Sequence, residues 1–331
     1  MDAFYPWRRL AAGMLACAAL APAATLAAAD AARFPDRPVR IIVPFSAGGV
    51  VDSVTRITAE NMAKVLQQPV IVENKTGAGG AIGADLVAKA PADGYTLLAV
   101  SPSFVVGPLL NPSIQGKGGK DFRAVAGIGA VPNVIVVPAS SPLRTLPQLL
   151  DAARKQPGTL TYASAGIGTS NHLSAELLAQ MTHVKLTHVP YKGQPEALSD
   201  LLGARVSMMA LTSAIARQQV QSGKLRALAV TSAKRTAVLP DVPTVAEAAQ
   251  LPGYEVGAWF GLVAPQGTPD AVVRKLADAA ARATADPATA RRLAELGMDL
   301  APQSAAAFDR FLDAETKKWT GVLKTAGITA Q

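Results

Sequence analysis

The chain has 331 residues, half of them hydrophobic and 17% charged, which is enough for two globular domains that each bury a core. The formal net charge is +8, but the Lys and Arg residues are scattered, and only 5% of the residues are aromatic. Because nucleic-acid-binding surfaces need clustered basic residues and rings for stacking, we expect no nucleic-acid partner. We interpret the excess positive charge as solvated surface with a mild attraction for anionic ligands.

The N-terminal segment has the pattern of an export signal. Arg8 and Arg9 precede an alanine-rich apolar run that ends in the small residues Ala27–Ala29. We predict a signal peptide over residues 1–29, cleaved near Ala29, and hence a periplasmic protein; the Sec and twin-arginine routes both stay open. The alternatives are a membrane anchor, for which the run is barely long enough, and a lipoprotein, in which Cys17 would follow only a stub of apolar residues. Cys17 is the only cysteine, so the exported chain has no thiol for a disulfide or a metal.

Strand-like and helix-like segments alternate along the rest of the chain, a pattern typical of α/β layers. Near the C-terminus, Thr268 is predicted to cap a helix whose first residue is Pro269. A closing helix is predicted to bury Phe308, Leu312, Trp319 and Leu323. We expect strands at residues 39–43, 70–73, 95–100, 134–137, 160–163, 206–210 and 225–230, and helices at residues 52–67, 82–89, 146–155, 172–181 and 196–202.

Two strand–turn–helix transitions carry the strongest functional signal. The first spans residues 41–67 with Gly48 and Gly49 in its turn, and the second spans residues 160–173 with Gly166 and Gly168. A glycine-rich turn leaves the first N–H groups of the following helix free, and such groups bind anions. Because ligands of open α/β sheets lie beyond the carboxyl ends of the strands, we predict two facing loops around a small anion. An ordinary strand-to-helix connection is the alternative, and the hydroxyls that follow Gly168 fit helix caps as well as ligand donors.

Several motifs occur in the order found in one known family. They are Phe34-Pro35-Asp36-Arg37-Pro38-Val39 with the strand that follows, Gly48-Gly49-Val50-Val51-Asp52, Val72-Glu73-Asn74-Lys75, Asp93-Gly94-Tyr95-Thr96, Ser164-Ala165-Gly166, His188-Val189-Pro190-Tyr191-Lys192-Gly193, Gly223-Lys224-Leu225-Arg226 and Leu239-Pro240-Asp241-Val242-Pro243-Thr244. With them the chain resembles the Bug family, the extracytoplasmic solute receptors of tripartite tricarboxylate transporters. The resemblance implies a two-domain Venus-flytrap of the type II periplasmic-binding-protein fold, which binds a small organic acid, amino acid or related solute between its domains and serves membrane transporter subunits. We expect a monomer without a cofactor.

The expected domains and ligand site follow from this fold. We expect the first domain at residues 30–133 with 258–331 and the second at 134–257, with the ligand in the cleft between them. The family's two binding loops fall on residues 45–52 and 166–172, a further pocket wall follows the strand at 95–100, and another cleft position follows the strand at 206–210. The expected ligand-binding residues are Phe45, Ser46, Ala47, Gly48, Gly49, Asp52, Ser101, Ser103, Gly166, Gly168, Thr169, Ser170, His172 and Thr212.

Two departures from the family pattern touch the expected cleft. The chain has Gly107-Pro108-Leu109-Leu110 and then Gly116-Lys117-Gly118-Gly119, where the family usually has Asn-Pro-Ala-Leu and a later Tyr-Asp-Pro element. Leu211 stands at a position that is often polar. The mode of binding is therefore expected to transfer from the family, whereas the identity of the ligand is not.

Single polar residues have other interpretations besides ligand binding. Asp52 fits a ligand ammonium group, but an acid in the first helical turn is also favourable by itself. His172 fits an anion donor or a packed residue at a helix start, whereas His183 and His188 are expected to be structural. Lys192 fits either solvated surface or anion attraction. The histidines and carboxylates show no metal-ligand spacing, so we predict no metal.

The rival class is an exported enzyme. The glycines of residues 77–83 imitate a dinucleotide-binding turn, but their spacing is looser than that motif requires. Ser164 is flanked by alanines, so the Gly-x-Ser-x-Gly turn of a hydrolase nucleophile is missing. We therefore expect no catalytic residues. A third hypothesis keeps the receptor fold but makes its membrane partner a sensor.

Overall fold

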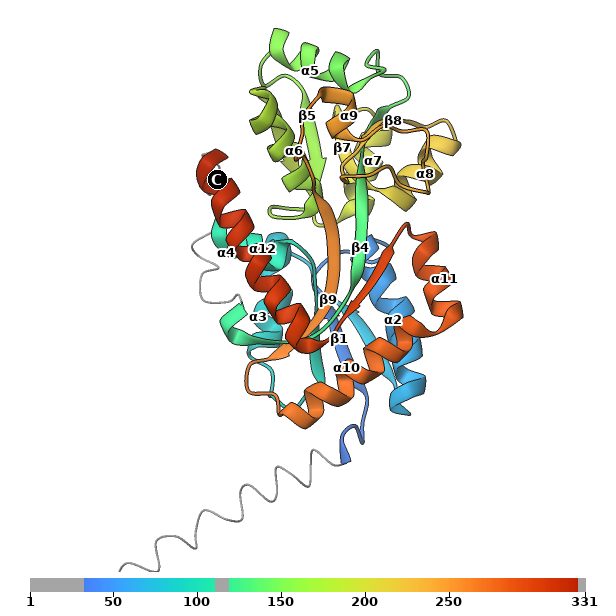
Figure 1. Ribbon diagram of the computed structural model, residues 1–331, viewed down its shortest axis with the longest axis vertical. Coiled ribbons are helices and arrows are strands. Elements are labelled where there is room, and N and C mark those ends of the chain that lie inside the picture. The colour runs from blue at the N-terminus through green and yellow to red at the C-terminus, as the bar shows by residue number, and fades with distance from the viewer. Residues whose placement is uncertain (1–32, 111–118, 327–331) are drawn as a thin grey trace, which may run out of the picture.

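The computed structural model describes residues 33–110 and 119–326, which form two lobes stacked along the long axis of the molecule (Figure 1). The predicted signal peptide and residues 116–118 of the departing segment lie outside the described residues. Within the described part, helices cover strands of one mixed, curled sheet. The predicted α/β class is therefore confirmed.

The first lobe is built on a mixed sheet with helices on both faces. Strand β1 pairs in parallel with β2 and β3, and β3 pairs in antiparallel with β9, which in turn pairs with the first part of β4. Its strands are β1 (Val39–Val43), β2 (Val70–Asn74), β3 (Thr96–Val100), β9 (Gly257–Pro265), β10 (Asp299–Gln303) and the start of β4 (Phe122–Pro138). Its helices are α2 (Val50–Leu66), α3 (Ala81–Ala88), α4 (Ser103–Leu110), α10 (Asp270–Ala285), α11 (Pro287–Glu295) and α12 (Ala305–Ala326), with short 3₁₀ turns at Ala78–Gly80 and Gly119–Asp121.

The second lobe repeats this layering on a smaller scale. Strand β5 pairs in parallel with β6 and β7, and the second part of β4 pairs in antiparallel with β7 and β8. Its remaining strands are β5 (Thr161–Ser164), β6 (Thr187–Pro190), β7 (Met208–Thr212) and β8 (Leu225–Val230). Its helices are α5 (Leu146–Lys155), α6 (Ser170–Thr182), α7 (Gln194–Leu202), α8 (Ser213–Gln221) and α9 (Val245–Ala249).

The long strand β4 links the lobes by changing partners along its length. Pro132 is its last residue paired with β9, opposite Gly257, and Asn133 is its first residue paired with β7, opposite Thr212. In Figure 1, β4 and β9 run side by side from one lobe toward the other. Two adjacent strands are therefore the connection about which the lobes would move relative to each other.

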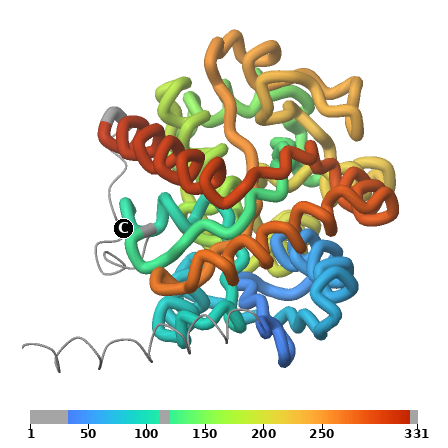
Figure 2. Tube along the Cα trace, turned by 60° about the horizontal axis from the view of Figure 1, so that its bottom comes forward, coloured from blue at the N-terminus to red at the C-terminus, as the bar shows by residue number. Residues whose placement is uncertain are grey.

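Successive residues of β1 serve the two faces of the first sheet. Ile41 is buried in the cluster that contains Val54 of α2 and Leu276 of α10, whereas Ile42 is buried in the cluster that contains Phe104 of α4. This alternation is the period of two that a strand buried on both faces requires. Figure 2 shows the result, with α10 beside α2 on one side and α12 along β4.

Most of the predicted elements are confirmed to within two residues, but several are longer or new. The strand expected at 134–137 is the end of the much longer β4, and β6, β9, β10, α4, α8, α9 and α11 were not predicted. The predicted cap of α10 is wrong by one residue: Pro269 is the N-cap, and the hydroxyl of Thr268 donates to the carbonyl of Pro265. The predicted core stripe of the closing helix, from Phe308 to Leu323, is buried as expected.

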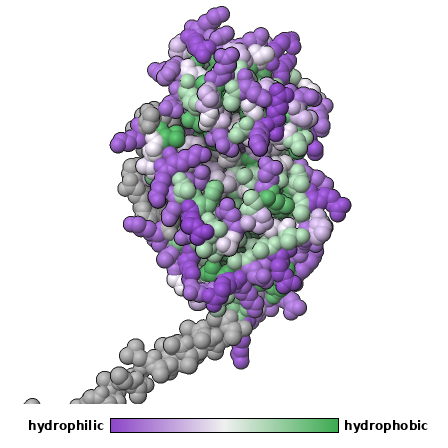
Figure 3. Space-filling model, viewed as in Figure 1, coloured by the Kyte–Doolittle hydropathy of each residue, from purple (hydrophilic) through white to green (hydrophobic). Residues whose placement is uncertain are grey.

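On the face seen in Figure 3, hydrophilic residues surround smaller hydrophobic areas. The described residues include no helix that is both long and apolar enough to cross a membrane. Several helices begin at the carboxyl ends of strands, among them α2 after β1, α4 after β3, α6 after β5 and α7 after β6. Those ends are where open α/β sheets bind ligands.

Candidate ligand-binding site

A cavity between the lobes collects the first residues of three helices. Val50 and Val51 begin α2, Ser170 and Asn171 begin α6, and Gln194 begins α7. The cavity measures about 30 Å³ for a water-sized sphere, room for roughly two waters. The lobes are thus closed around a small space. The other lining residues are Phe45, Ser46, Gly49, Ser101, Pro102, Ala165, Thr169, Ala258 and Phe260.

The polarity of this cavity comes from the backbone and from neutral side chains. None of the residues that line it is charged. The first N–H groups of a helix have no partner within the helix, and each helix start carries roughly half a positive charge. The side chains of Ser101, Asn171 and Gln194 add neutral donors, whereas the hydroxyl of Ser170 donates to Asn133 Oδ1 at 3.5 Å. The cavity is therefore suited to an anionic group with an apolar neighbour, which Phe45 and Phe260 can contact.

The first cleft loop is held in place by Asp52. Its carboxylate accepts hydrogen bonds from the N–H group of Gly48 at 2.9 Å, from Arg56 Nε at 3.0 Å and from Asn74 Nδ2 at 2.9 Å. Burial raises the pKa of the Asp52 carboxyl group, but the hydrogen bonds from Arg56, Gly48 and Asn74 outweigh burial and leave this pKa below its usual value. The side chain is 5% exposed and does not line the cavities described here. Asp52 therefore shapes the loop, in contrast to its predicted contact with a ligand.

The expected donors of the first loop are only partly at the cavity. Phe45, Ser46 and Gly49 line it as predicted. Ala47 and Gly48 are exposed and line none of the cavities described here. The N–H group of Gly48 is bound to Asp52, so the expectation that it faces a ligand is corrected.

In the second cleft loop, the N–H groups of Gly166 and Gly168 are also bound to acceptors within the protein. The hydroxyl of Ser164 accepts from Gly166 N at 3.1 Å, and His172 Nδ1 accepts from Gly168 N at 3.3 Å. Thr169 is the N-cap of α6, and its hydroxyl donates to the carbonyl of Gly166 at 2.7 Å. Gly166 lines a neighbouring cavity, and Gly168 lines none of those described. Thr169 and Ser170 line the main cavity, whereas the N–H groups of the two glycines are bound to Ser164 and His172.

His172 lies behind the loop, packed against other rings. Its ring centroid is 4.5 Å from that of His188, and His188 stacks on Tyr162 at 4.8 Å. Burial lowers the pKa of His172 to about 3, with a further contribution from His188, and burial lowers the pKa of His188 to about 4. Both rings are therefore neutral near pH 7. His172 lines none of the cavities described here, so its position fits a role in holding the loop and not the predicted donation to a bound anion.

A serine–histidine contact in this cluster resembles a hydrolase pair only in part. Ser164 Oγ lies 2.7 Å from His188 Nε2, and Ser164 is fully buried. It lines none of the cavities described here, and its oxygen already accepts from Gly166. The contact therefore supports the loop.

The third histidine, His183, is the exposed C-cap residue of α6.

A row of hydrogen bonds fixes the residues that begin α6 and α7. The hydroxyl of Thr212 donates to Gln194 Oε1 at 2.9 Å, and Gln194 Nε2 donates to Asn171 Oδ1 at 3.4 Å. Asn171 Nδ2 in turn donates to the carbonyl of Ala210 at 2.6 Å. Thr212 is fully buried behind the cavity, so it orients Gln194 in place of its predicted ligand contact. Sequence reasoning missed Asn171 and Gln194, although each begins a helix directly after a predicted strand or loop.

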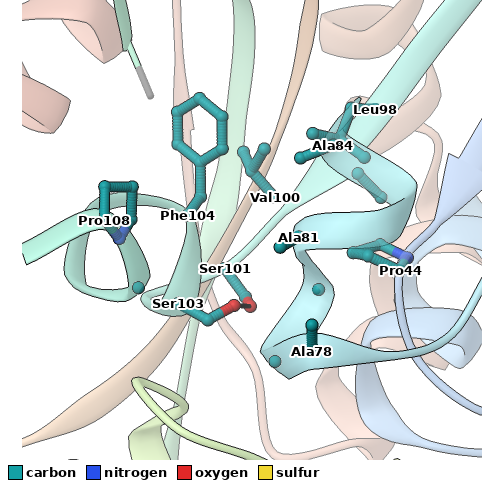
Figure 4. Close-up of a pocket in the computed structure, with 14 residues that line it drawn as sticks. Pro44, Ala78, Ala81, Ala84, Leu98, Val100, Ser101, Ser103, Phe104 and Pro108 are labelled. Carbon is teal, nitrogen blue, oxygen red and sulfur yellow. Dashed lines mark hydrogen bonds between the residues drawn. The ribbon is translucent and has the colours of Figure 1, made fainter. Parts of the chain in front are cut away.

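The two predicted serines after β3 lie at a neighbouring cavity of about 30 Å³. Ser101 lines both this cavity and the main one, and Ser103 lines only this one. Figure 4 shows their hydroxyl groups side by side, close to Ala78 and across from Phe104. Leu211, at the often polar family position, is fully buried in β7 and lines neither cavity.

A larger cavity of about 570 Å³ opens beside the main one and shares Phe45 and Ala165 with it. Tyr191, Lys192 and Glu196 of the second lobe line it.

Among the described residues, no group of three or more His, Cys, Asp or Glu side chains could hold a metal ion.

Two α/β lobes joined by neighbouring strands, with a cavity between them that gathers helix starts, define the class of two-domain solute-binding receptors. The family model described as "Tripartite tricarboxylate transporter family receptor" matches residues 54–328. The chain therefore belongs to this family of solute-binding receptors, and the resemblance drawn from its motifs is confirmed.

Individual relatives agree with this assignment. A Pseudomonas sp. strain P51 protein described as "UPF0065 protein in tcbD-tcbE intergenic region" is 45% identical, covering 86% of this chain and 85% of that protein. The solved periplasmic binding protein BugD is 37% identical with a TM-score of 0.85, covering 90% of this chain and 100% of that one. A Rhodopseudomonas palustris structure with adipate is 35% identical with a TM-score of 0.82, covering 90% of this chain and 100% of that one. MatC from Rhodopseudomonas palustris, with bound malate, is 34% identical with a TM-score of 0.83, covering 88% of this chain and 100% of that one.

Proposed function

We propose that this receptor is exported to the periplasm and captures a small organic acid by closing its two domains around one carboxylate group. The observation that carries the proposal is the cavity into which α2, α6 and α7 point their first residues without any charged side chain. A carboxylate placed there accepts hydrogen bonds from backbone N–H groups and neutral side chains of both lobes. Such charge-assisted hydrogen bonds are roughly twice as strong as neutral ones.

The relatives support an organic acid as the ligand class. One solved neighbour is described with adipate and another with malate, and both are dicarboxylates. A carboxylate head fits the small cavity, while the rest of the ligand extends toward the larger cavity that shares Phe45 and Ala165 with it. The binding experiment identifies the part of the ligand beyond its carboxylate group.

Binding is coupled to domain movement because the contacts come from both lobes. Ser46 and Gly49 belong to the first lobe, whereas Ser170, Asn171 and Gln194 belong to the second. A ligand that touches all of them stabilises the closed arrangement over the open one. We place the domains at residues 30–133 with 258–331 and at 134–257, because β4 changes partners next to this boundary, between Pro132 and Asn133.

The proposed partners are the membrane subunits of a tripartite tricarboxylate-type transporter, because the family model is that of a receptor of such transporters. The receptor's role is delivery of the closed complex. No reacting group is assigned, because the one serine–histidine contact is buried away from the cavities described here.

The test compares acids with their neutral esters. Malate, adipate, amino acids and aromatic acids at 1 mM are screened by thermal unfolding, and any ligand with a Kd near 1 μM should add about 4 kcal/mol to the free energy of unfolding. The matching methyl ester should have a much smaller effect, because it lacks the charge that strengthens the hydrogen bonds. Equal shifts from an acid and its ester would show that the cavity does not recognise a carboxylate.

A further inference from the structure

One hydrogen bond joins a residue of the ligand cavity directly to the opposite lobe. The hydroxyl of Ser46, in the first cleft loop, donates to Glu196 Oε1, in the first turn of α7, at 2.6 Å. The two residues are 150 positions apart in sequence. Gly193, the N-cap residue of α7, lies against the same serine. We call Ser46, Gly193 and Glu196 the closure contact.

A glycine is needed at position 193 because of atoms in the opposite lobe and not because of its own backbone conformation. A Cβ atom at this position would lie 2.7 Å from Ser46 Cβ and 2.9 Å from Ser46 Oγ, closer than real Cβ atoms come to other atoms. Its φ of −174° is extended backbone that any residue adopts. The absence of a side chain therefore matters chiefly when the lobes are together, although a Cβ would also lie 3.1 Å from Oε2 of Glu196 in the same lobe.

The hydrogen bond from Ser46 to Glu196 likewise forms only in the closed arrangement. It joins a hydroxyl to a carboxylate, which makes it stronger than a neutral hydrogen bond, although exposure of Glu196 to water reduces its contribution. A contact that exists in one state alone shifts the equilibrium toward that state. Because Gln194 lies between Gly193 and Glu196 and lines the ligand cavity, the same contact fixes the start of α7 beside the ligand.

From this geometry we infer that Ser46, Gly193 and Glu196 act as a closure contact that sets the affinity for ligand by stabilising the closed receptor. Gly193 is a positioning residue, because it lines none of the cavities described above, whereas Glu196 also lines the larger cavity toward which the rest of the ligand extends. The inference rests on the proposed function for its effect on affinity. Its effect on the shape of the protein can be measured independently of any ligand.

Two other interlobe approaches surround the cleft but give a less clear test. A Cβ on Gly79 would lie 2.8 Å from the carbonyl oxygen of Ile167, and one on Gly168 would lie 3.1 Å from the nitrogen of Gly107. Gly79 and Gly168 both have positive φ, so a side chain would strain the backbone of one lobe as well as obstruct closure. At Gly193 the backbone is unstrained, and the two nearest atoms to a Cβ belong to the opposite lobe.

The experiment compares Gly193→Ala with Gly203→Ala, which lies at the other end of α7. A Cβ on Gly203 meets its nearest atom at 3.5 Å, an ordinary contact within the same lobe. With malate, adipate or another acid that binds the unmodified protein, Gly193→Ala should raise Kd about tenfold or more, whereas Gly203→Ala should change it less than about twofold. X-ray scattering at saturating acid should give a larger radius of gyration for Gly193→Ala than for the unmodified protein.

Glu196→Gln provides a second measurement that does not depend on the folding of the glycine variant. It keeps the size of the side chain and an oxygen acceptor but removes the charge, so Kd should rise about threefold. The inference is overturned if Gly193→Ala binds the acid as tightly as Gly203→Ala does. If Gly193→Ala does not fold, unchanged binding by Glu196→Gln overturns it.

Failure of the proposed function is distinguishable from failure of the closure contact. If the unmodified protein binds none of the acids, the proposed ligand class is wrong. The radius of gyration measured by X-ray scattering without ligand then tests the closure contact. A radius of gyration that is larger for Gly193→Ala than for the other two proteins then supports it. Equal radii for all three proteins overturn it.

Discussion

The hydroxyl of Ser164 lies 2.7 Å from His188 Nε2, at the point where β5 ends and the second cleft loop begins. The same hydroxyl accepts from the N–H group of Gly166, and His172, whose ring is 4.5 Å from that of His188, accepts from Gly168. Two neutral histidines and one serine therefore hold the loop from behind. The conformation that the cleft presents depends on both rings staying unprotonated.

The first prediction is a loss of stability in mild acid. Folding lowers the pKa of His172 to about 3 and that of His188 to about 4, whereas an unfolded chain titrates histidine near pH ~6.5. Between these values the unfolded state binds more protons, so the free energy of unfolding is highest above pH ~6.5 and falls as the pH drops toward 4. The slope should reach about 1.4 kcal/mol per pH unit for each histidine. Urea unfolding at pH 7.5, 6 and 5 measures it.

Variants separate these histidines from the general effect of acid. His188→Gln removes one of the two titrations, so its stability should fall less steeply between pH 6.5 and 5 than that of the unmodified protein. His183→Gln is the matched control, because His183 is an exposed C-cap residue outside the ring cluster. The same pH slope in all three proteins would contradict the buried-histidine account.

The second prediction concerns Asp52, whose carboxylate holds the first cleft loop. Asp52→Ala leaves the N–H group of Gly48 without its acceptor and the amide of Asn74 with the carbonyl of Phe45 alone, so the free energy of unfolding should fall by about 1–3 kcal/mol. Asp270→Ala, which also removes an acid from a first helical turn, should cost less, because the ion pair between Asp270 and Arg123 is at the surface. Chemical denaturation measures both. Equal losses would mean that Asp52 has no special structural role.

The third prediction separates the residue at the cavity from the residue behind it. Gln194→Ala removes a neutral donor from the cavity, so Kd for the acid that binds should rise roughly five- to tenfold. Thr212→Val keeps the shape but loses the hydroxyl that donates to Gln194, so its effect on Kd should be smaller. Calorimetric titration measures both variants. If Thr212→Val weakens binding more than Gln194→Ala, Thr212 contacts the ligand itself, as the sequence first indicated.

The sequence predicted elements that have strong local signals. The run from Val39 to Val43, the glycine turn after it and the periodic apolar residues of α2 lie next to each other, so β1 and α2 could be found with their boundaries nearly correct. Strand β9 escaped prediction because Gly257 and Gly261 interrupt its apolar residues. Gly261 fits there because Phe308 packs directly over it, a contact between distant segments.

The candidate site was predicted in its location more than in its atoms. Ser46 and Ser170 line the cavity because they belong to turns that the glycines mark in the sequence. The direction of the N–H groups of Gly48 and Gly168 could not be predicted, because it depends on side-chain acceptors that only the folded chain brings into position. Gln194 was missed for a similar reason, since its helix reaches the cleft through the pairing of β5 with β6.

The last prediction concerns export. If residues 1–29 are a signal peptide, the periplasmic protein should begin at or near Asp30, and intact mass or N-terminal sequencing measures this. Cleavage there agrees with the packing of the first lobe, because Phe34 is 2% exposed and its ring contacts that of Tyr95 at 4.8 Å. Cleavage beyond Phe34 would remove this buried ring and cost about 3–5 kcal/mol of stability. A periplasmic product with a lipid on Cys17, or a cytosolic product that retains Met1, would contradict the prediction.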